Sequence, residues 1–144
     1  IDSPLETFEE DDALFDLASA MNAHAGARLA PRRFDYPAAQ RVRAFIDDTT
    51  QRSITLGQLE AVSGQNRWRL SRDFRVLFGT SPYRYLTMRR LEHCKRRLRA
   101  GQTLADAAFD AGFADQSHMT RQFTDAYGIP PGRWLKLTQQ AQND

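Results

Sequence analysis

The chain has 144 residues, 41% of them hydrophobic and 26% charged, a composition typical of one globular domain or two small ones. The single cysteine, Cys94, excludes an intrachain disulfide and a cysteine-rich zinc site, so we expect a reducing cytoplasmic environment. No run of about 18 apolar residues is present, which argues against a membrane partner. Position 1 is Ile and no signal-peptide pattern follows, so we expect a fragment of a longer protein.

The net charge of +2 conceals an acidic leader and a basic body. Residues 1–36 carry eight acids against three bases, a net charge of −5, whereas residues 37–144 carry 17 bases against 10 acids, a net charge of +7. This division predicts that the body binds an anion, with nucleic acid favoured, although ribosomal and membrane-surface proteins share such a balance.

The leader is predicted to contain a helix over residues 4–24. Leu14, Leu17, Ala18 and Met21 recur at helical spacing, and acids gather at its start, where a helix N-terminus favours them. Residues 25–37, with one glycine and two prolines, resemble a linker. Residues 1–36 are therefore predicted to form a helix followed by a linker, the alternative being a disordered remnant.

All later signals are helical. Capping residues, glycine breaks and helix-opening prolines predict helices over 37–50, 56–63, 66–78, 82–100, 104–111, 115–127 and 131–138. Strand alternation and hairpin turns are absent from the sequence. We therefore predict an all-α fold of about seven helices plus the N-terminal helix.

An internal repeat organises these helices. The stripe Leu70, Phe74, Leu77 and Phe78 recurs 49 residues later as Met119, Phe123, Ala126 and Tyr127, and Gly79 and Pro82 recur as Gly128 and Pro131. Each copy is a short capped helix, a glycine turn and a longer helix, which is the helix-turn-helix pattern. We predict one unit over 37–81, a linker helix over 82–100 and a second unit over 101–144, together forming a DNA-binding domain over 37–144.

The outer faces of the two longer helices are candidates for reading bases. Opposite the apolar stripe of helix 66–78 lie Trp68, Arg72 and Arg75. The second unit offers Gln116, Ser117, His118 and Arg121. Arginine can bind guanine and glutamine can bind adenine in the major groove. Helix-start and flanking residues are assigned to phosphates: Arg67, Arg69, Thr55, Thr103 and Thr124. A solvated charged face with Trp68 folded against a neighbour is the alternative.

Helix 82–100 is strongly basic, with seven Arg or Lys residues against one acid, Glu92, and an apolar seam of Leu91, Cys94 and Leu98. At about 28 Å it is long enough to space two recognition helices by about 34 Å, one turn of B-DNA. Its basic residues are expected to face phosphates or solvent.

Three stretches carry a family resemblance: LSRDFRVLFGTSPYRYL, MRRLEHCKRRLRAG and LADAAFDAGFADQSHMTRQFTDAYGIPP. Residues 37–138 resemble the DNA-binding domain of AraC/XylS-type transcriptional regulators. The resemblance implies a bacterial, cytoplasmic, seven-helix domain whose two units bind consecutive major grooves of double-stranded DNA. It also implies that residues 1–36 are the end of a missing sensing or dimerisation domain. It admits RNA polymerase as a partner and a homodimer through that N-terminal domain. The chain departs from the family pattern at His118-Met119, where an aromatic residue is common, and at Trp134-Leu135, where Tyr-Arg is usual.

Enzymatic and metal-binding functions have little support. His93 and Cys94 are adjacent on a helix and therefore diverge, and His24, His93 and His118 lack metal-ligand spacing. No phosphate-cradling glycine loop is present, so no catalytic residue, metal or cofactor is expected. Two other functions stay open: a helical module that binds an acidic protein, and a DNA-targeting domain fused to an enzyme.

Overall fold

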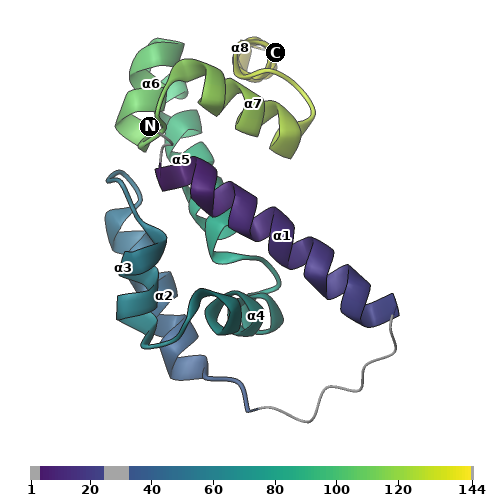
Figure 1. Ribbon diagram of the computed structural model, residues 1–144. Helices are drawn as coiled ribbons and strands as arrows, with labels where there is room; N and C mark the ends of the chain where they lie inside the picture. Colours follow the sequence, from purple (N-terminus) through teal and green to yellow (C-terminus); the bar gives the residue numbers. More distant parts are fainter. Residues whose placement is uncertain (1–3, 25–32, 144) are drawn as a thin grey trace. The chain divides into compact units, whose positions relative to one another are not determined.

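The computed structural model describes residues 4–24 and 33–143, and these residues form helices without a strand (Figure 1). The helices are α1 (Pro4–His24), α2 (Tyr36–Thr49), α3 (Leu56–Ser63), α4 (Arg67–Phe78), α5 (Pro82–Arg99), α6 (Leu104–Ala111), α7 (Gln116–Tyr127) and α8 (Pro131–Asn143). The predicted all-α class with two helix-turn-helix units is confirmed. The largest boundary error is in α8, which continues to Asn143 rather than ending near position 138.

Local capping explains where the short helices begin. Thr55 accepts a hydrogen bond from the backbone N–H of Gln58, whose side chain bonds back to the Thr55 N–H, completing the predicted capping box. Asn66, Thr103 and Asp115 cap α4, α6 and α7 by a single bond each, in which the side-chain oxygen accepts from a backbone N–H three residues later. These caps satisfy N–H groups that would otherwise lack partners at the helix starts.

The chain divides into two compact units. The first comprises Ile1–Thr49 and Ser53–Tyr85, and its core is formed where α2, α3 and α4 meet. Val42, Ile46, Leu59, Leu70 and Phe74 are fully buried there. The apolar stripe predicted for α4 is thus partly confirmed, with Leu70 and Phe74 as its buried members.

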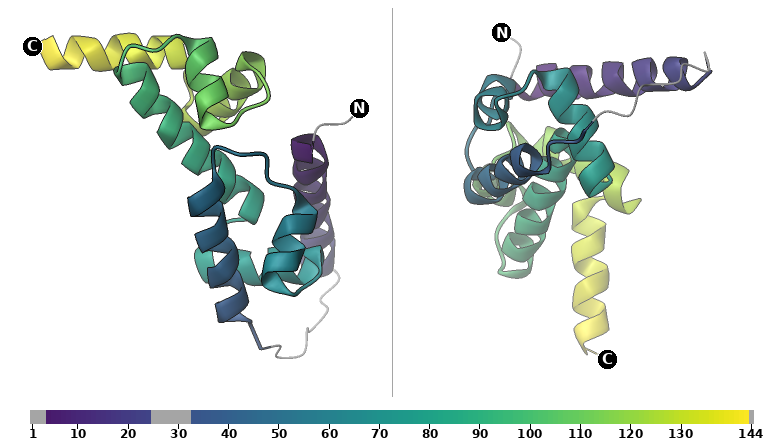
Figure 2. Two further views of the ribbon diagram at one scale, coloured as in Figure 1. Left: turned by 90° about the vertical axis from the view of Figure 1, so that its left-hand side faces the viewer. Right: turned by 90° about the horizontal axis from the view of Figure 1, so that it is seen from below.

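The second unit comprises Thr50–Arg52 and Leu86–Asp144. Its buried cluster draws on the seam of α5 and on α6 and α7, and contains Leu91, Cys94, Leu98, Ala107, Ala108, Ala111, Phe113, Met119 and Phe123. Trp134 covers this cluster, with its ring 5.7 Å from that of Phe123. Figure 2 shows that α8, in yellow, packs by its first turns while its C-terminal half extends away from α6 and α7.

One basic residue of α5 has a structural role that the sequence did not reveal. Arg90 is buried, and its guanidinium donates hydrogen bonds to the carbonyl oxygens of Thr50 (2.8 Å) and Arg52 (2.9 Å). The expectation that the basic residues of this helix face phosphates or solvent is wrong for Arg90. Arg90 instead fixes residues 50–52 to the second unit, because these carbonyls lie outside any helix and require a donor.

The leader helix has an unexpected orientation. Its predicted apolar stripe is exposed, with Leu14, Leu17 and Met21 each more than half accessible to solvent. Among the described side chains of α1, Asp12, Phe15 and Asp16 instead contact residues of α4. Most of the predicted linker, residues 25–32, lies outside the described residues, and residues 33–35 are irregular.

Candidate nucleic-acid interface

Helix α4 presents the first set of predicted base-reading residues on the side away from its core. Burial of Leu70 and Phe74 turns Trp68 outward, where its side chain is 48% exposed. Arg72 and Arg75 are partly covered, with side chains 21% and 24% exposed. None of the three lies inside the hydrophobic core. The partners of the two arginines decide what each is free to contact.

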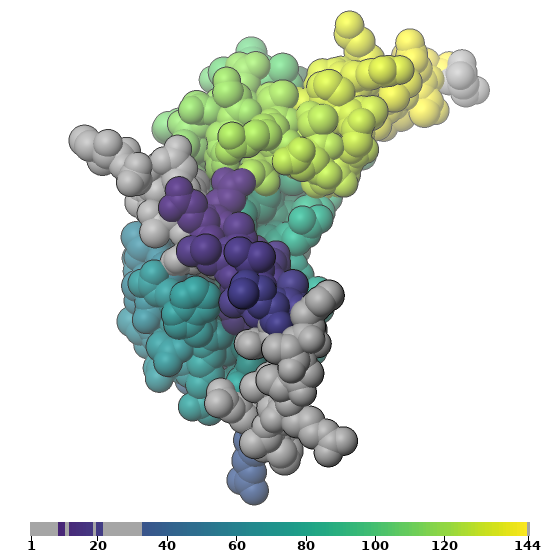
Figure 3. Space-filling model, turned by 45° about the vertical axis from the view of Figure 1, so that its right-hand side comes forward, coloured from purple at the N-terminus to yellow at the C-terminus, as the bar shows by residue number. Residues whose placement is uncertain are grey.

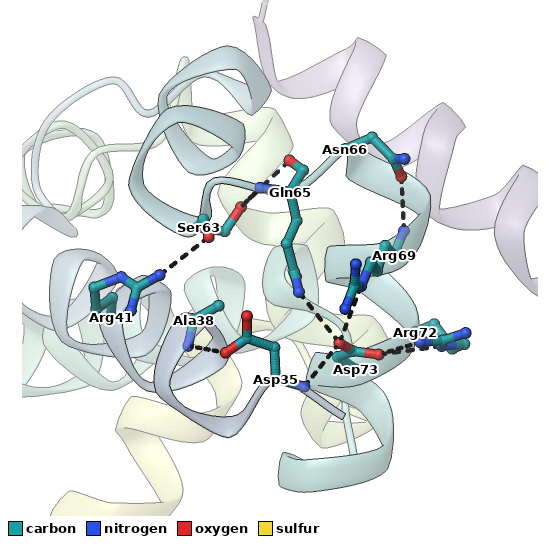
Figure 4. Close-up of polar contacts among 9 residues, drawn as sticks. All are labelled: Asp35, Ala38, Arg41, Ser63, Gln65, Asn66, Arg69, Arg72 and Asp73. Atoms are coloured by element: carbon teal, nitrogen blue, oxygen red, sulfur yellow. Dashed lines mark hydrogen bonds and ion pairs between the residues drawn. The ribbon is translucent and has the colours of Figure 1, made fainter. Parts of the chain in front are cut away.

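Arg72 is held by a buried carboxylate that the sequence analysis did not single out. Asp73 is completely buried and accepts bonds from the Arg72 guanidinium at 2.7 Å and from the backbone N–H of Asp35 at 3.2 Å (Figure 4). Gln65 donates to it at 3.4 Å, and the Arg69 guanidinium lies 4.0 Å away. Burial alone would raise the pKa of Asp73, but the bonds from Arg72 and Asp35 lower it below its usual value.

Asp73 therefore joins three segments around α4. It links the entry to α2, the turn before α4 and two arginines of α4 itself. The signal in the sequence is weak: an acid one position before Phe74 lies beside the apolar stripe, where a solvated residue is not expected.

Arg75 is engaged by α1. Its guanidinium donates to Asp12 and, at 2.6 Å, to Asp16, and it lies 4.7 Å from the centre of the Phe15 ring. The Phe15 ring also stacks on Trp68, with centroids 6.2 Å apart and planes inclined by 19°. In Figure 3 the purple atoms of α1 lie directly over the teal surface of the first unit. Part of the predicted base-reading face is thus covered from within the chain.

Asp12 is the more enclosed of the two carboxylates in this contact. Its second carboxylate oxygen accepts a hydrogen bond from the Ser81 hydroxyl at 2.8 Å. Burial raises the pKa of Asp12 above its usual value, and the bonds from Ser81 and Arg75 offset that rise only in part. The contact therefore imposes a desolvation cost on Asp12.

Helix α7 positions the second set. Met119 and Phe123 are buried, which leaves Gln116, Ser117 and Arg121 exposed on the outer side. His118 differs from the other candidates, because its ring is half-buried with its centre 5.7 Å from that of Phe113.

The residues assigned to phosphates have diverse surroundings. Arg67 forms an ion pair with Glu60 at 3.1 Å, and the Thr124 hydroxyl donates to the Thr120 carbonyl within α7. The hydroxyls of Thr55 and Thr103 accept the capping bonds of α3 and α6. These two threonines stand at helix starts, where backbone N–H groups and the helix dipole favour an anion.

Other chemistry has few candidates among the described residues. Cys94 is buried in the second core, and burial raises its pKa to about 11, so its reactive thiolate is suppressed at neutral pH. Within residues 4–24 and 33–143, no three His, Cys, Asp or Glu side chains are grouped to hold a metal ion. The same residues include no helix with the length and apolar character to cross a bilayer.

Comparison with known proteins identifies the architecture. The family model described as a helix-turn-helix domain matches residues 59–137, more than half of the chain. The chain belongs to the AraC-type helix-turn-helix family. This AraC-type domain is 35% identical over 75 residues to an uncharacterized HTH-type transcriptional regulator, YbfI of Bacillus subtilis (strain 168), covering 52% of the chain and 27% of the relative.

Two further relatives show how much of a regulator the domain represents. It is 35% identical over 86 residues to a putative AraC-like transcription regulator of Streptomyces lividans, covering 59% of the chain and 28% of the relative. It is 22% identical over 116 residues to the multiple antibiotic resistance protein MarA of Escherichia coli (strain K12), covering 80% of the chain and 91% of that protein. The chain therefore spans about a quarter of the first two relatives and most of the third.

Solved structures share the fold. A probable AraC family transcriptional regulator from Rhodopseudomonas palustris CGA009 superposes with a TM-score of 0.62 at 27% identity, covering 69% of this chain and 95% of that one. The DNA-binding domain of AdpA, solved in complex with a target DNA, gives a TM-score of 0.68 at 19% identity, covering 74% and 97%. At 19% identity, the match to AdpA supports the fold alone.

Proposed function

We propose that this domain binds double-stranded DNA in a sequence-specific manner as the DNA-binding part of a bacterial transcriptional regulator. The observation that carries the proposal is the duplicated helix-turn-helix. In each copy the longer helix buries an apolar stripe and turns polar side chains outward. Such a helix fits the major groove, and two of them, α4 and α7, would read consecutive grooves.

The proposed roles divide into base reading and phosphate binding. Trp68, Arg72 and Arg75 would contact bases in one half-site, with Arg72 oriented by Asp73. The second half-site would be read by Gln116, Ser117, His118 and Arg121. The phosphate contacts would come from Arg67, Arg69, Thr55, Thr103 and Thr124, which fix the register of the protein on the duplex without choosing its sequence.

The cellular setting follows from this function. A regulator of bacterial transcription acts in the cytoplasm, and RNA polymerase is the partner whose recruitment or exclusion it would control. A homodimer would form through an N-terminal domain of the full regulator. No catalytic activity is assigned to this domain.

The test is selection of bound sites from random DNA, followed by anisotropy titration of the best duplex and a shuffled one at one salt concentration. Arg72→Ala and Arg121→Ala should each weaken binding to the selected site by about 1–3 kcal/mol and relax base preference in different half-sites. Arg96→Ala removes the same charge from an exposed position outside both recognition helices and serves as the control.

Two results would contradict the proposal. Equal affinity for selected and shuffled duplexes would favour a module that binds acidic partners without reading sequence. Equal losses for Arg72→Ala on every duplex would reduce that residue to a phosphate contact.

A further inference from the structure

The orientation of α1 is the reverse of that of an ordinary surface helix. Positions 12, 15 and 16 share one face by helical spacing, and this face, with its two carboxylates, meets α4. Leu14, Leu17 and Met21 lie on the opposite side and are exposed. A helix added for stability would bury its apolar stripe. This one matches a basic face instead.

The two carboxylates bind Arg75 as an anionic ligand would. Asp12 and Asp16 are one helical turn apart and bind different nitrogens of the same guanidinium, at 2.5 and 2.6 Å. Arg75 cannot direct these N–H groups to α1 and to a base or phosphate at once, because a guanidinium has a fixed set of donors.

Steric cover adds to the electrostatic match. The Phe15 ring contacts both Trp68 and Arg75: its centre lies 6.2 Å from that of the Trp68 ring and 4.7 Å from the Arg75 guanidinium. The Ser81 hydroxyl, just before α5, holds the other oxygen of Asp12. A DNA duplex approaching this face of α4 would meet two carboxylates and an aromatic ring before reaching Arg75 or the stacked face of Trp68.

We propose that α1 is an intrachain inhibitor of the first helix-turn-helix unit, which must leave α4 before Arg75 and the ring face of Trp68 that stacks on Phe15 can contact DNA. The chain then exists in a closed state, with α1 on α4, and an open state that binds the first half-site. The measured affinity equals the affinity of the open state multiplied by the fraction of chains that are open. This inference rests on the proposed DNA-binding function and adds its regulation.

The test compares two pairs of variants of the full chain, and the two members of each pair have the same net charge. Asp16→Lys places a cation beside Arg75 and should open the contact, and Asp16 is exposed enough for the change to leave the fold intact. Glu10→Lys, at an exposed position of the same helix, makes the same change in charge. Phe15→Ala removes the stacked ring without changing charge, and Leu17→Ala, at a position 59% exposed, is its control.

We expect Asp16→Lys to bind the selected duplex about tenfold more tightly than Glu10→Lys, and Phe15→Ala to bind more tightly than Leu17→Ala. Both gains should vanish when the half-site whose preference depends on Arg72 is scrambled, because α1 is proposed to cover α4 of the first unit. Circular dichroism of each variant should show unchanged helix content.

The outcomes separate the two proposals. If the wild-type chain selects a site but Asp16→Lys and Glu10→Lys bind it equally, or if the gain survives scrambling of that half-site, the inhibitory role of α1 is rejected while DNA binding stands. If no variant distinguishes the selected duplex from the shuffled one, the proposed function itself is rejected.

Discussion

Replacement of Asp73 by alanine should destabilise the first unit more than replacement of any exposed acid by alanine. Its side chain is completely buried and accepts bonds from Arg72, from the Asp35 backbone and from Gln65. Removing one partner of a buried ion pair typically costs about 3–5 kcal/mol. The partly exposed Arg72 can recover some hydration, so we expect a loss near the lower end, about 3 kcal/mol.

Urea unfolding followed by circular dichroism at pH 7 measures this loss, with Asp48→Ala, an exposed acid, as the control. The pKa of Asp73 is lowered in the folded state, so its carboxylate contributes stability at pH values above its ordinary pKa of 3.8. That contribution disappears as the pH falls through the lowered pKa of Asp73. The difference in free energy of unfolding between wild type and variant should therefore narrow in that range. A loss no larger than that of Asp48→Ala would refute the reasoning.

Two further predictions concern the second unit. Gly112→Ala should cost about 1–3 kcal/mol more than Gly64→Ala in thermal or urea unfolding. Both glycines have positive φ, but only at Gly112 would the new Cβ lie 2.8 Å from the Thr50 carbonyl oxygen, so equal costs would show that this close approach is unimportant. Cys94, with its pKa raised to about 11, should react with a thiol reagent at pH 8 only after denaturant is added, and rapid labelling of the native chain would contradict its burial.

Most of the fold could be predicted because its signals are local. Caps such as Thr55 and Asp115, and the glycines and prolines between helices, determine helix ends through neighbouring residues alone. The repeat then indicated that α4 and α7 are equivalent. The outward placement of Trp68 and Arg121 follows from the same periodicity.

The remaining features depend on contacts between distant parts of the chain. No residue near Arg90 in the sequence indicates that its guanidinium donates hydrogen bonds to backbone carbonyls about 40 residues earlier. Arg75 and Asp12 are 63 residues apart in the sequence. Because they pair, α1 packs by its carboxylate face, whereas its apolar stripe predicts that the opposite face is buried. A helical wheel gives the direction of a side chain but does not identify the element that meets it.

The bonds from Arg90 to Thr50 and Arg52 also limit how the protein can be dissected. A fragment that starts within α5 would keep this arginine in its interior but lose both carbonyl acceptors, which come from a segment preceding α3. The C-terminal unit is therefore not a module that can be excised at the linker helix. Its independent expression would require residues 50–52 to be supplied as well, by a longer fragment or by circular permutation.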